Sequence, residues 1–154
     1  MSRVLVALAL CVVASSASAQ APSIAGLWLT AAKNAQVQIG PCADAARGPI
    51  CGVIAGLIEP KGPDGAIVPP EQATDFRNAD PALRERKIIG LTLIYDFKKG
   101  SEPNSFEEGT IYNASNSKTY KANMSLQSDG TLRLRGYVGS PMLDRKSTRL
   151  NSSH

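Results

Sequence analysis

Short apolar segments recur along the chain, and clusters of Gly, Pro, Asn and Asp separate one segment from the next. Segments of this length that are rich in β-branched and aromatic residues are typical of β-strands. The pattern predicts seven strands, over residues 24–30, 35–39, 50–58, 88–97, 105–113, 119–127 and 131–138. We therefore expect an all-β protein.

The last of these segments shows the alternation most clearly. Its two sets of positions are Leu132, Leu134 and Val138 on one face and Arg133, Arg135 and Tyr137 on the other. A period of two indicates a sheet with one buried and one solvated face. The preceding Ser128-Asp129-Gly130 is a hairpin signal. Consecutive short strands of this kind predict a small antiparallel meander barrel, because closing a sheet removes its edges.

One connection, over residues 60–87, is longer than the others and holds four prolines before Asp75. Asp80 followed by Pro81 is a helix-start signal, so we expect a short helix over residues 81–86. Long loops in compact domains are often binding segments, so this loop is a place to look for function.

The first residues carry the features of a secretory signal peptide. Arg3 precedes an unbroken apolar run over residues 4–14, and Ala17-Ser18-Ala19 is a small-x-small cleavage site. We expect residues 1–19 to be removed before Gln20 and the product to be secreted or periplasmic. The run is too short to span a bilayer, so an uncleaved anchor is the lesser alternative and no integral membrane segment is expected after cleavage.

The last residues, 144–154 (DRKSTRLNSSH), match codon for codon the translation of a common sequencing-library adapter. Like a tag or a fusion scar, such a tail is excluded from reasoning about the fold. We therefore expect an artefact tail over residues 144–154 and a single β-barrel-like domain over residues 20–143.

Trimming both ends changes the electrostatics. The formal net charge falls from +4 for the whole chain to +1 for residues 20–143. The basic pI of the whole chain is therefore no reason to expect a nucleic-acid partner, and none is predicted. The cut also removes His154, which excludes histidine-based triads, dyads and metal sites unless the C-terminal segment that the tail replaces supplies a histidine. The segment that holds Asp75, Asn78 and Asp80 could suggest a calcium loop, but it lacks the glycine and the final glutamate of such loops. No metal and no cofactor are predicted.

Two cysteines remain, Cys42 and Cys51. No further soft ligands accompany them, and the signal peptide sends the chain to a compartment where thiols oxidise. A structural disulfide is favoured over a redox pair, because catalytic dithiols usually lie two residues apart.

Many separated positions resemble, in order, the secreted bacterial family named domain of unknown function 2147. They are Gly26-Leu27-Trp28, Cys42, Cys51-Gly52-Val53-Ile54, Asp75, Asn78, Asp80-Pro81, Leu83-Arg84, Arg86, Gly90-Leu91, Gly109, Ile111-Tyr112, Lys118, Tyr120, Leu132 and Arg135-Gly136-Tyr137-Val138-Gly139. The resemblance implies secretion and a small β-rich fold, with no agreed activity. The family continues after Leu143 into a last strand with Trp and Arg, which the tail replaces here. We therefore expect an unpaired edge beside the first or penultimate strand and a poorly covered Trp28.

Gly26-Leu27-Trp28 is also similar to the Gly-x-Trp of lipocalins. In that superfamily the tryptophan closes the barrel floor beneath an arginine of the last strand, through a cation-π contact. The resemblance implies a barrel-closing role for Gly26 and Trp28. The alternative is that Trp28 is simply the largest core residue of a β domain.

Five polar residues are candidates for a site at the barrel mouth: Arg84, Arg86, Tyr112, Lys118 and Tyr120. Arg or Lys would hold an anionic head group and the tyrosines would pack on an apolar body. The structural alternative is that the tyrosines pair across strands and the arginines tie the loop to the barrel through ion pairs.

These features favour a non-enzymatic secreted or periplasmic protein that binds a small apolar or amphipathic ligand. A rival hypothesis is a small envelope hydrolase that uses carboxylates, drawn from Asp75, Glu107 and Glu108, with Lys and Tyr groups at the mouth. A third is an envelope interaction module without a ligand. No feature of the sequence specifies an oligomeric state.

Overall fold

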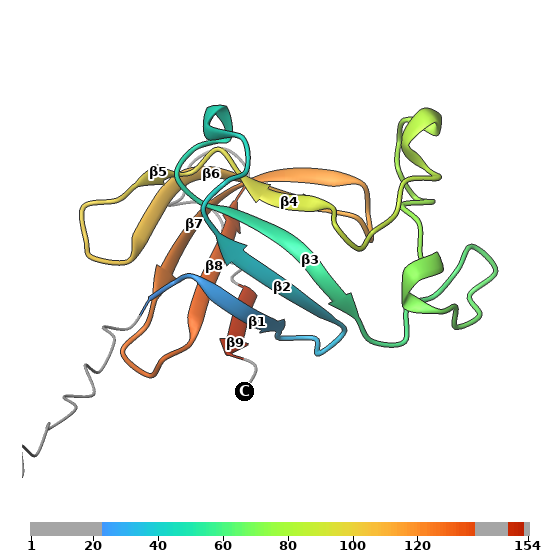
Figure 1. The fold of residues 1–154 in the computed structure, drawn as a ribbon, viewed down its shortest axis with the longest axis horizontal. Helices are drawn as coiled ribbons and strands as arrows, with labels where there is room; N and C mark the ends of the chain where they lie inside the picture. Colours follow the sequence, from blue (N-terminus) through green and yellow to red (C-terminus); the bar gives the residue numbers. More distant parts are fainter. Residues whose placement is uncertain (1–22, 138–147, 153–154) are drawn as a thin grey trace, which may run out of the picture.

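The computed structural model describes residues 23–137 in full and residues 148–152 as backbone, and the fold is built almost entirely of strands (Figure 1). The strands are β1 (Gly26–Thr30), β2 (Ala35–Gly40), β3 (Cys51–Leu57), β4 (Thr92–Tyr95), β5 (Lys98–Lys99), β6 (Ser105–Asn113), β7 (Lys118–Leu126), β8 (Leu132–Tyr137) and β9 (Thr148–Ser152). Three 3-10 helices lie between them: η1 (Ala45–Arg47), η2 (Pro70–Gln72) and η3 (Pro81–Leu83).

Every strand pairing is antiparallel, and the strands form one sheet in the order β4-β3-β2-β1-β9-β8-β7-β6-β5. An additional pairing between β4 and β6 joins the two arms of this sheet, with Ile94 opposite Ile111 and Tyr95 opposite Thr110. The predicted all-β antiparallel barrel is thereby confirmed. The β4–β6 pairing brings the two halves of the chain into contact around a shared interior.

The strand boundaries agree with the sequence pattern to within about two residues except around β4: the strand expected over residues 88–97 is confined to Thr92–Tyr95, and the short β5 that follows was not predicted. Residues 88–91 form a turn closed by the Leu91 N–H donating to the Ile88 carbonyl at 3.0 Å, so β4 begins only at Thr92. The expected hairpin is present, with Gly130 at a φ of 79° between β7 and β8. The helix expected over residues 81–86 is a single 3-10 turn, capped by the Asp80 side chain accepting from the Ala82 N–H at 3.0 Å.

The tail contributes a strand, contrary to our expectation of an open edge. β9 lies between β1 and β8, with Leu29 opposite Asn151 and Arg133 opposite Arg149. Trp28 is only 4% exposed, so the expected poor coverage is also wrong. The physical reason is that ladder hydrogen bonds join backbone groups, so a strand position can be filled by a segment of unrelated sequence. The origin of the tail in an adapter stays a prediction.

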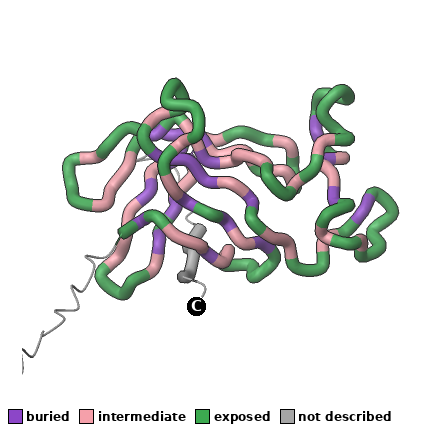
Figure 2. Tube along the Cα trace, in the orientation of Figure 1, coloured by how far each residue is buried: buried purple, intermediate pink, exposed green. Residues whose placement is uncertain are grey.

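The core lies inside the curved sheet, where Figure 2 shows the buried stretches along the strands. Ile39, Ile94, Ala122 and Leu132 have no exposed surface. Leu132 and Leu134 are buried and Arg133 is exposed, as the alternation predicts. Tyr137, expected on the solvated face, is instead 5% exposed. Most of a tyrosine side chain is apolar ring, which favours burial on either face of a sheet.

Trp28 on β1 belongs to this core, and its indole N–H donates to the Ile24 carbonyl at 2.9 Å. The polar end of the buried ring is therefore satisfied without a solvent contact. The cation-π partner implied by the lipocalin resemblance belongs to the last strand of the family, which the tail is predicted to replace here, so the described residues do not test this contact.

The predicted disulfide joins Cys42 to Cys51, with their Cα atoms 4.8 Å apart. Cys51 is the first residue of β3, and Cys42 begins the loop that contains η1. Closing so short a loop stabilises by about 2–3 kcal/mol in the chain-entropy model. The bond holds this loop against the start of β3.

Phe97, between β4 and β5, is buried against the backbone of β6 at Gly109. A Cβ atom at Gly109 would overlap the Phe97 ring. The ladder between β6 and β7 shifts register between Phe106 and Gly109, and Glu108 in this bulge has a φ of 55°. The bulge and the glycine together let the ring reach the core.

We predict that Gly109→Ala destabilises the fold by about 1–3 kcal/mol, because the added methyl group overpacks the Phe97 ring. Gly40→Ala is the matched control, since a Cβ there meets no atom within 4 Å. Urea unfolding followed by tryptophan fluorescence measures both free energies. Equal stabilities of the two variants would contradict the overlap.

Candidate functional site

A cavity of about 1060 Å³ opens at the end of the barrel where β3 runs into the long loop over residues 58–91. Its barrel side is largely apolar and includes Ile54, Leu57, Leu93, Ile111 and Leu134. Its other wall comes from the loop and includes Ala73, Phe76 and Ile88. In Figure 1 this loop, drawn in green, projects beyond the ends of the strands.

Asp75 fixes the position of the loop. It is 1% exposed, and its carboxylate accepts hydrogen bonds from three side chains on two parts of the chain. Arg86 donates from Nε at 2.9 Å and forms an ion pair through Nη2 at 2.7 Å. The Tyr112 hydroxyl donates at 2.8 Å, and Asn78 Nδ2 donates at 2.7 Å. We call Asp75, Asn78, Arg86 and Tyr112 the Asp75 cluster.

Burying a carboxylate is costly unless it is paired and hydrogen-bonded, and the Asp75 cluster meets both conditions. The Arg86 side chain is 32% exposed while that of Asp75 has no exposed surface. Desolvation opposes the charged form of Arg86, but the hydrogen bond and the charge of Asp75 outweigh it and raise the pKa of Arg86. The Arg86 guanidinium also stacks over the Tyr112 ring at 5.1 Å.

The cluster ties the loop to the hairpin between β6 and β7. Tyr112 lies near the end of β6, whereas Asp75, Asn78 and Arg86 belong to the loop. A second tie lies nearby, where the Ala79 N–H donates to the Ser117 hydroxyl at 2.7 Å. The loop wall of the cavity is therefore held by polar contacts to this hairpin, in addition to the backbone hydrogen bonds that join Gly90 and Leu91 to Ile54 of β3.

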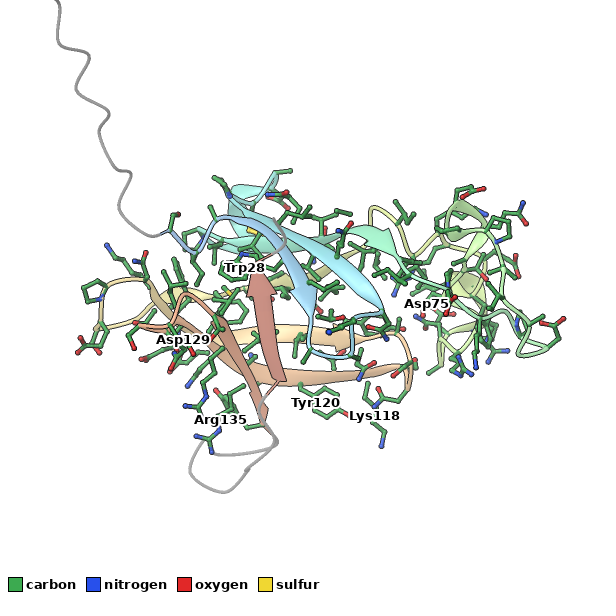
Figure 3. The ribbon with its side chains drawn as sticks, turned by 90° about the horizontal axis from the view of Figure 1, so that it is seen from below. Trp28, Asp75, Lys118, Tyr120, Asp129 and Arg135 are labelled. Atoms are coloured by element: carbon green, nitrogen blue, oxygen red, sulfur yellow. A yellow bond between two sulfur atoms is a disulfide. The ribbon has the colours of Figure 1, made fainter. Side chains whose placement is uncertain are left out.

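The structure separates the five residues predicted for the site. Tyr112 and Tyr120 line the cavity. Arg86 lies behind Tyr112 in the Asp75 cluster, and Arg84 donates from Nε to the Asn78 carbonyl at 2.8 Å. Lys118 is exposed at the start of β7 and is not among the lining residues (Figure 3). Both arginines contact residues of their own loop, Arg84 a backbone carbonyl and Arg86 the Asp75 carboxylate, whereas the structural alternative had them tie the loop to the barrel through ion pairs.

Three charged residues of the cavity lining were not singled out from the sequence: Glu59, Lys61 and Arg77. All three belong to the loop, and Arg77 stacks over the neighbouring Phe76 ring at 4.4 Å. Their only sequence signal is membership of the long proline-rich connection. No local periodicity shows which loop side chains face the barrel.

The carboxylates considered for hydrolysis lie apart. Asp75 contacts Tyr112 near the end of β6, whereas Glu107 and Glu108 lie in the first half of that strand, roughly 13 Å or more of strand length from Tyr112 at about 3.4 Å per residue. Glu108 pairs with Lys98 at 2.6 Å, and the hydrogen bond and charge of Lys98 lower the pKa of Glu108.

Within residues 23–137, no three His, Cys, Asp or Glu side chains gather in a way that could hold a metal ion. Of the helices in the described part of the chain, none has the length and apolar character needed to cross a bilayer.

We predict that Tyr112→Phe lowers the free energy of unfolding by about 1–3 kcal/mol, because it removes a hydrogen bond from a buried carboxylate. The matched control is Tyr120→Phe, whose hydroxyl accepts from the exposed Asn116 at 2.9 Å, with an expected loss below about 0.5 kcal/mol. Equilibrium urea denaturation measures the free energy of unfolding of both variants and of the wild type. A loss for Tyr112→Phe no larger than the control would show that Asp75 does not depend on Tyr112.

A protein of known structure shares the fold. The chain is similar to one described as "Protein HP1028 from the human pathogen Helicobacter pylori belongs to the lipocalin family", with a TM-score of 0.68 and 19% identity. The likeness covers 87% of this chain and 85% of the other, and at this identity it shows a lipocalin-like fold alone. A search of curated proteins finds no match.

A family model matches residues 26–149, which include every described strand from β1 to β8 and the start of β9. The family is described as an uncharacterized protein conserved in bacteria. The match also contains the disulfide, the Asp75 cluster and all the cavity-lining residues. The chain therefore belongs to the bacterial family DUF2147.

Proposed function

We propose that the chain is a secreted or periplasmic binding protein that takes a small apolar or amphipathic ligand into the cavity at the barrel mouth. The single observation that carries the proposal is the cavity itself, about 1060 Å³ with an apolar barrel side. Ligand pockets usually have volumes of about 300–1000 Å³ and are lined by apolar side chains with a few polar groups. The cavity is slightly larger than this range, which leaves room for a ligand of lipid size.

The lining changes character from the barrel to the loop. Ile54, Leu93 and Leu134 come from strands, whereas Lys61 and Arg77 come from the loop. Tyr120 on β7 offers both an apolar ring and a hydroxyl. This division favours an amphipathic ligand with its apolar part in the barrel.

Export is supported by two independent features. The Cys42–Cys51 disulfide is of a kind that persists in oxidising compartments. Residues 1–19 have the charge, apolar run and cleavage site of a signal peptide. Both agree with a periplasmic or secreted location.

Binding is favoured over the rival hydrolase because of the state of Asp75. Its carboxylate already accepts hydrogen bonds from Arg86, Tyr112 and Asn78, and it has no exposed side-chain surface. A general base has to reach the proton that it abstracts. The third hypothesis, an interaction module without a ligand, predicts that the cavity binds none of the probes named below.

We predict that filling the cavity with Leu57→Trp weakens binding of a fluorescent long-chain fatty acid at least about tenfold, because the indole takes space that the acyl chain needs. Leu57 is half-buried at the end of β3 and lines the cavity. Fluorescence titration of the purified protein gives the Kd.

The control is Ala55→Trp, on the same strand but exposed and outside the lining, which should leave the Kd unchanged. Wild-type protein that binds neither the fatty acid nor any lipid co-purifying in native mass spectrometry would overturn the proposed function. Turnover of esterase or glycosidase substrates that Asp75→Asn abolishes would favour the hydrolase instead.

The export proposal predicts that the chain, expressed with its own leader in a Gram-negative host, yields a periplasmic product that begins at Gln20. Intact-mass measurement of the periplasmic fraction reads the first residue directly, and alkylation with and without reductant reports the disulfide. Retention of residues 1–19 on a cytoplasmic product would contradict export.

A further inference from the structure

We infer that the ligand of this cavity carries an anionic head group, and that Lys61 and Arg77 hold it. The inference rests on the proposed function and adds the charge class of the ligand and the residues that select it. It differs from the assignment made on sequence, in which Arg84, Arg86 and Lys118 were the cations.

The charged side chains of the lining gather on one wall. Glu59, Lys61 and Arg77 all belong to the loop, whereas the strands contribute apolar residues and neutral polar ones. A ligand whose apolar part lies among the strands therefore brings its head group to the loop. Two cations against one carboxylate give this wall an excess positive charge.

Within residues 23–137, no carboxylate neutralises either cation of this wall. Neither Lys61 nor Arg77 forms an ion pair with a carboxylate of residues 23–137, where the salt bridges are Arg86 with Asp75 and Lys98 with Glu108. The Phe76 ring beneath the Arg77 guanidinium restrains that side chain. A restrained, unpaired guanidinium beside an apolar cavity is suited to binding a carboxylate or a phosphate.

The cations expected from the sequence are unsuited to this role. Arg86 already forms an ion pair with Asp75, and Arg84 donates to a backbone carbonyl of the loop. Neither lines the cavity, and Lys118 does not line it either. Among the charged residues of the lining, Lys61 and Arg77 would therefore favour an anionic head group, and Glu59 would disfavour it.

Four amphiphiles of equal chain length test the inference: dodecanoate, dodecyl phosphate, dodecanol and protonated dodecylamine. Wild-type protein should bind the two anions more tightly than the alcohol, and the alcohol more tightly than the amine. Inorganic phosphate alone should not displace dodecanoate, which separates an amphiphile site from a free-anion site. Isothermal titration at low ionic strength gives each Kd.

Lys61→Gln and Arg77→Gln should each weaken dodecanoate binding about fivefold, as expected for one charge contact near the surface, and leave the Kd of dodecanol unchanged. Glu59→Gln should tighten dodecanoate and weaken dodecylamine, because it removes the opposing charge. Lys87→Gln is the matched control, an exposed lysine of the same loop outside the lining. Added salt should reduce the preference for anions.

Equal affinity for all four amphiphiles, unaffected by these variants, would overturn the charge assignment and leave the proposed function standing. Binding of none of the four by wild-type protein would overturn both. Displacement of dodecanoate by inorganic phosphate at a similar Kd would overturn the claim that the ligand is an amphiphile and would show only a site for free anions.

Discussion

A single buried carboxylate organises the end of this barrel. Asp75 has no exposed side-chain surface, and a charge in that position is tolerated only where the fold supplies its partners. The partners are Arg86 and Asn78 from the same loop and Tyr112 from β6, so satisfying one carboxylate fixes the loop against the hairpin. The loop that is fixed in this way is the wall of the cavity and carries all of its charged groups.

The barrel itself depends on less specific interactions. Antiparallel ladders carry the sheet from β4 through β9 to β5, and the β4–β6 pairing joins its arms. Because these ladders join backbone groups, the position between β1 and β8 accepts residues 148–152, whatever their origin. Particular residue types are required where a side chain packs closely on the backbone, as the Phe97 ring does on Gly109.

Much of the scaffold could be predicted from the sequence, because strands, the Asp129-Gly130 hairpin and the Cys42–Cys51 bond are set by local pattern and by compartment. The site could be predicted only in part. Tyr112 and Asp75 are 37 residues apart, and no periodicity signals that a loop carboxylate will meet a strand tyrosine. Arg86 was predicted as a ligand-binding residue, and the structure shows it paired with Asp75. Lys61 and Arg77 were not singled out from the sequence, because a proline-rich loop does not show which of its side chains line the cavity.

The central claim is that the wall fixed by Asp75 presents its cations to a ligand whose apolar chain lies among the strands. A crystal structure with a long-chain carboxylate brominated at its terminal carbon tests this most directly. We expect anomalous density for bromine among Ile54, Leu93 and Leu134, with the carboxylate beside Lys61 and Arg77 and the Asp75 cluster intact. Bromine at the loop with the carboxylate toward the strands, or a cavity closed by its own side chains, would contradict the claim.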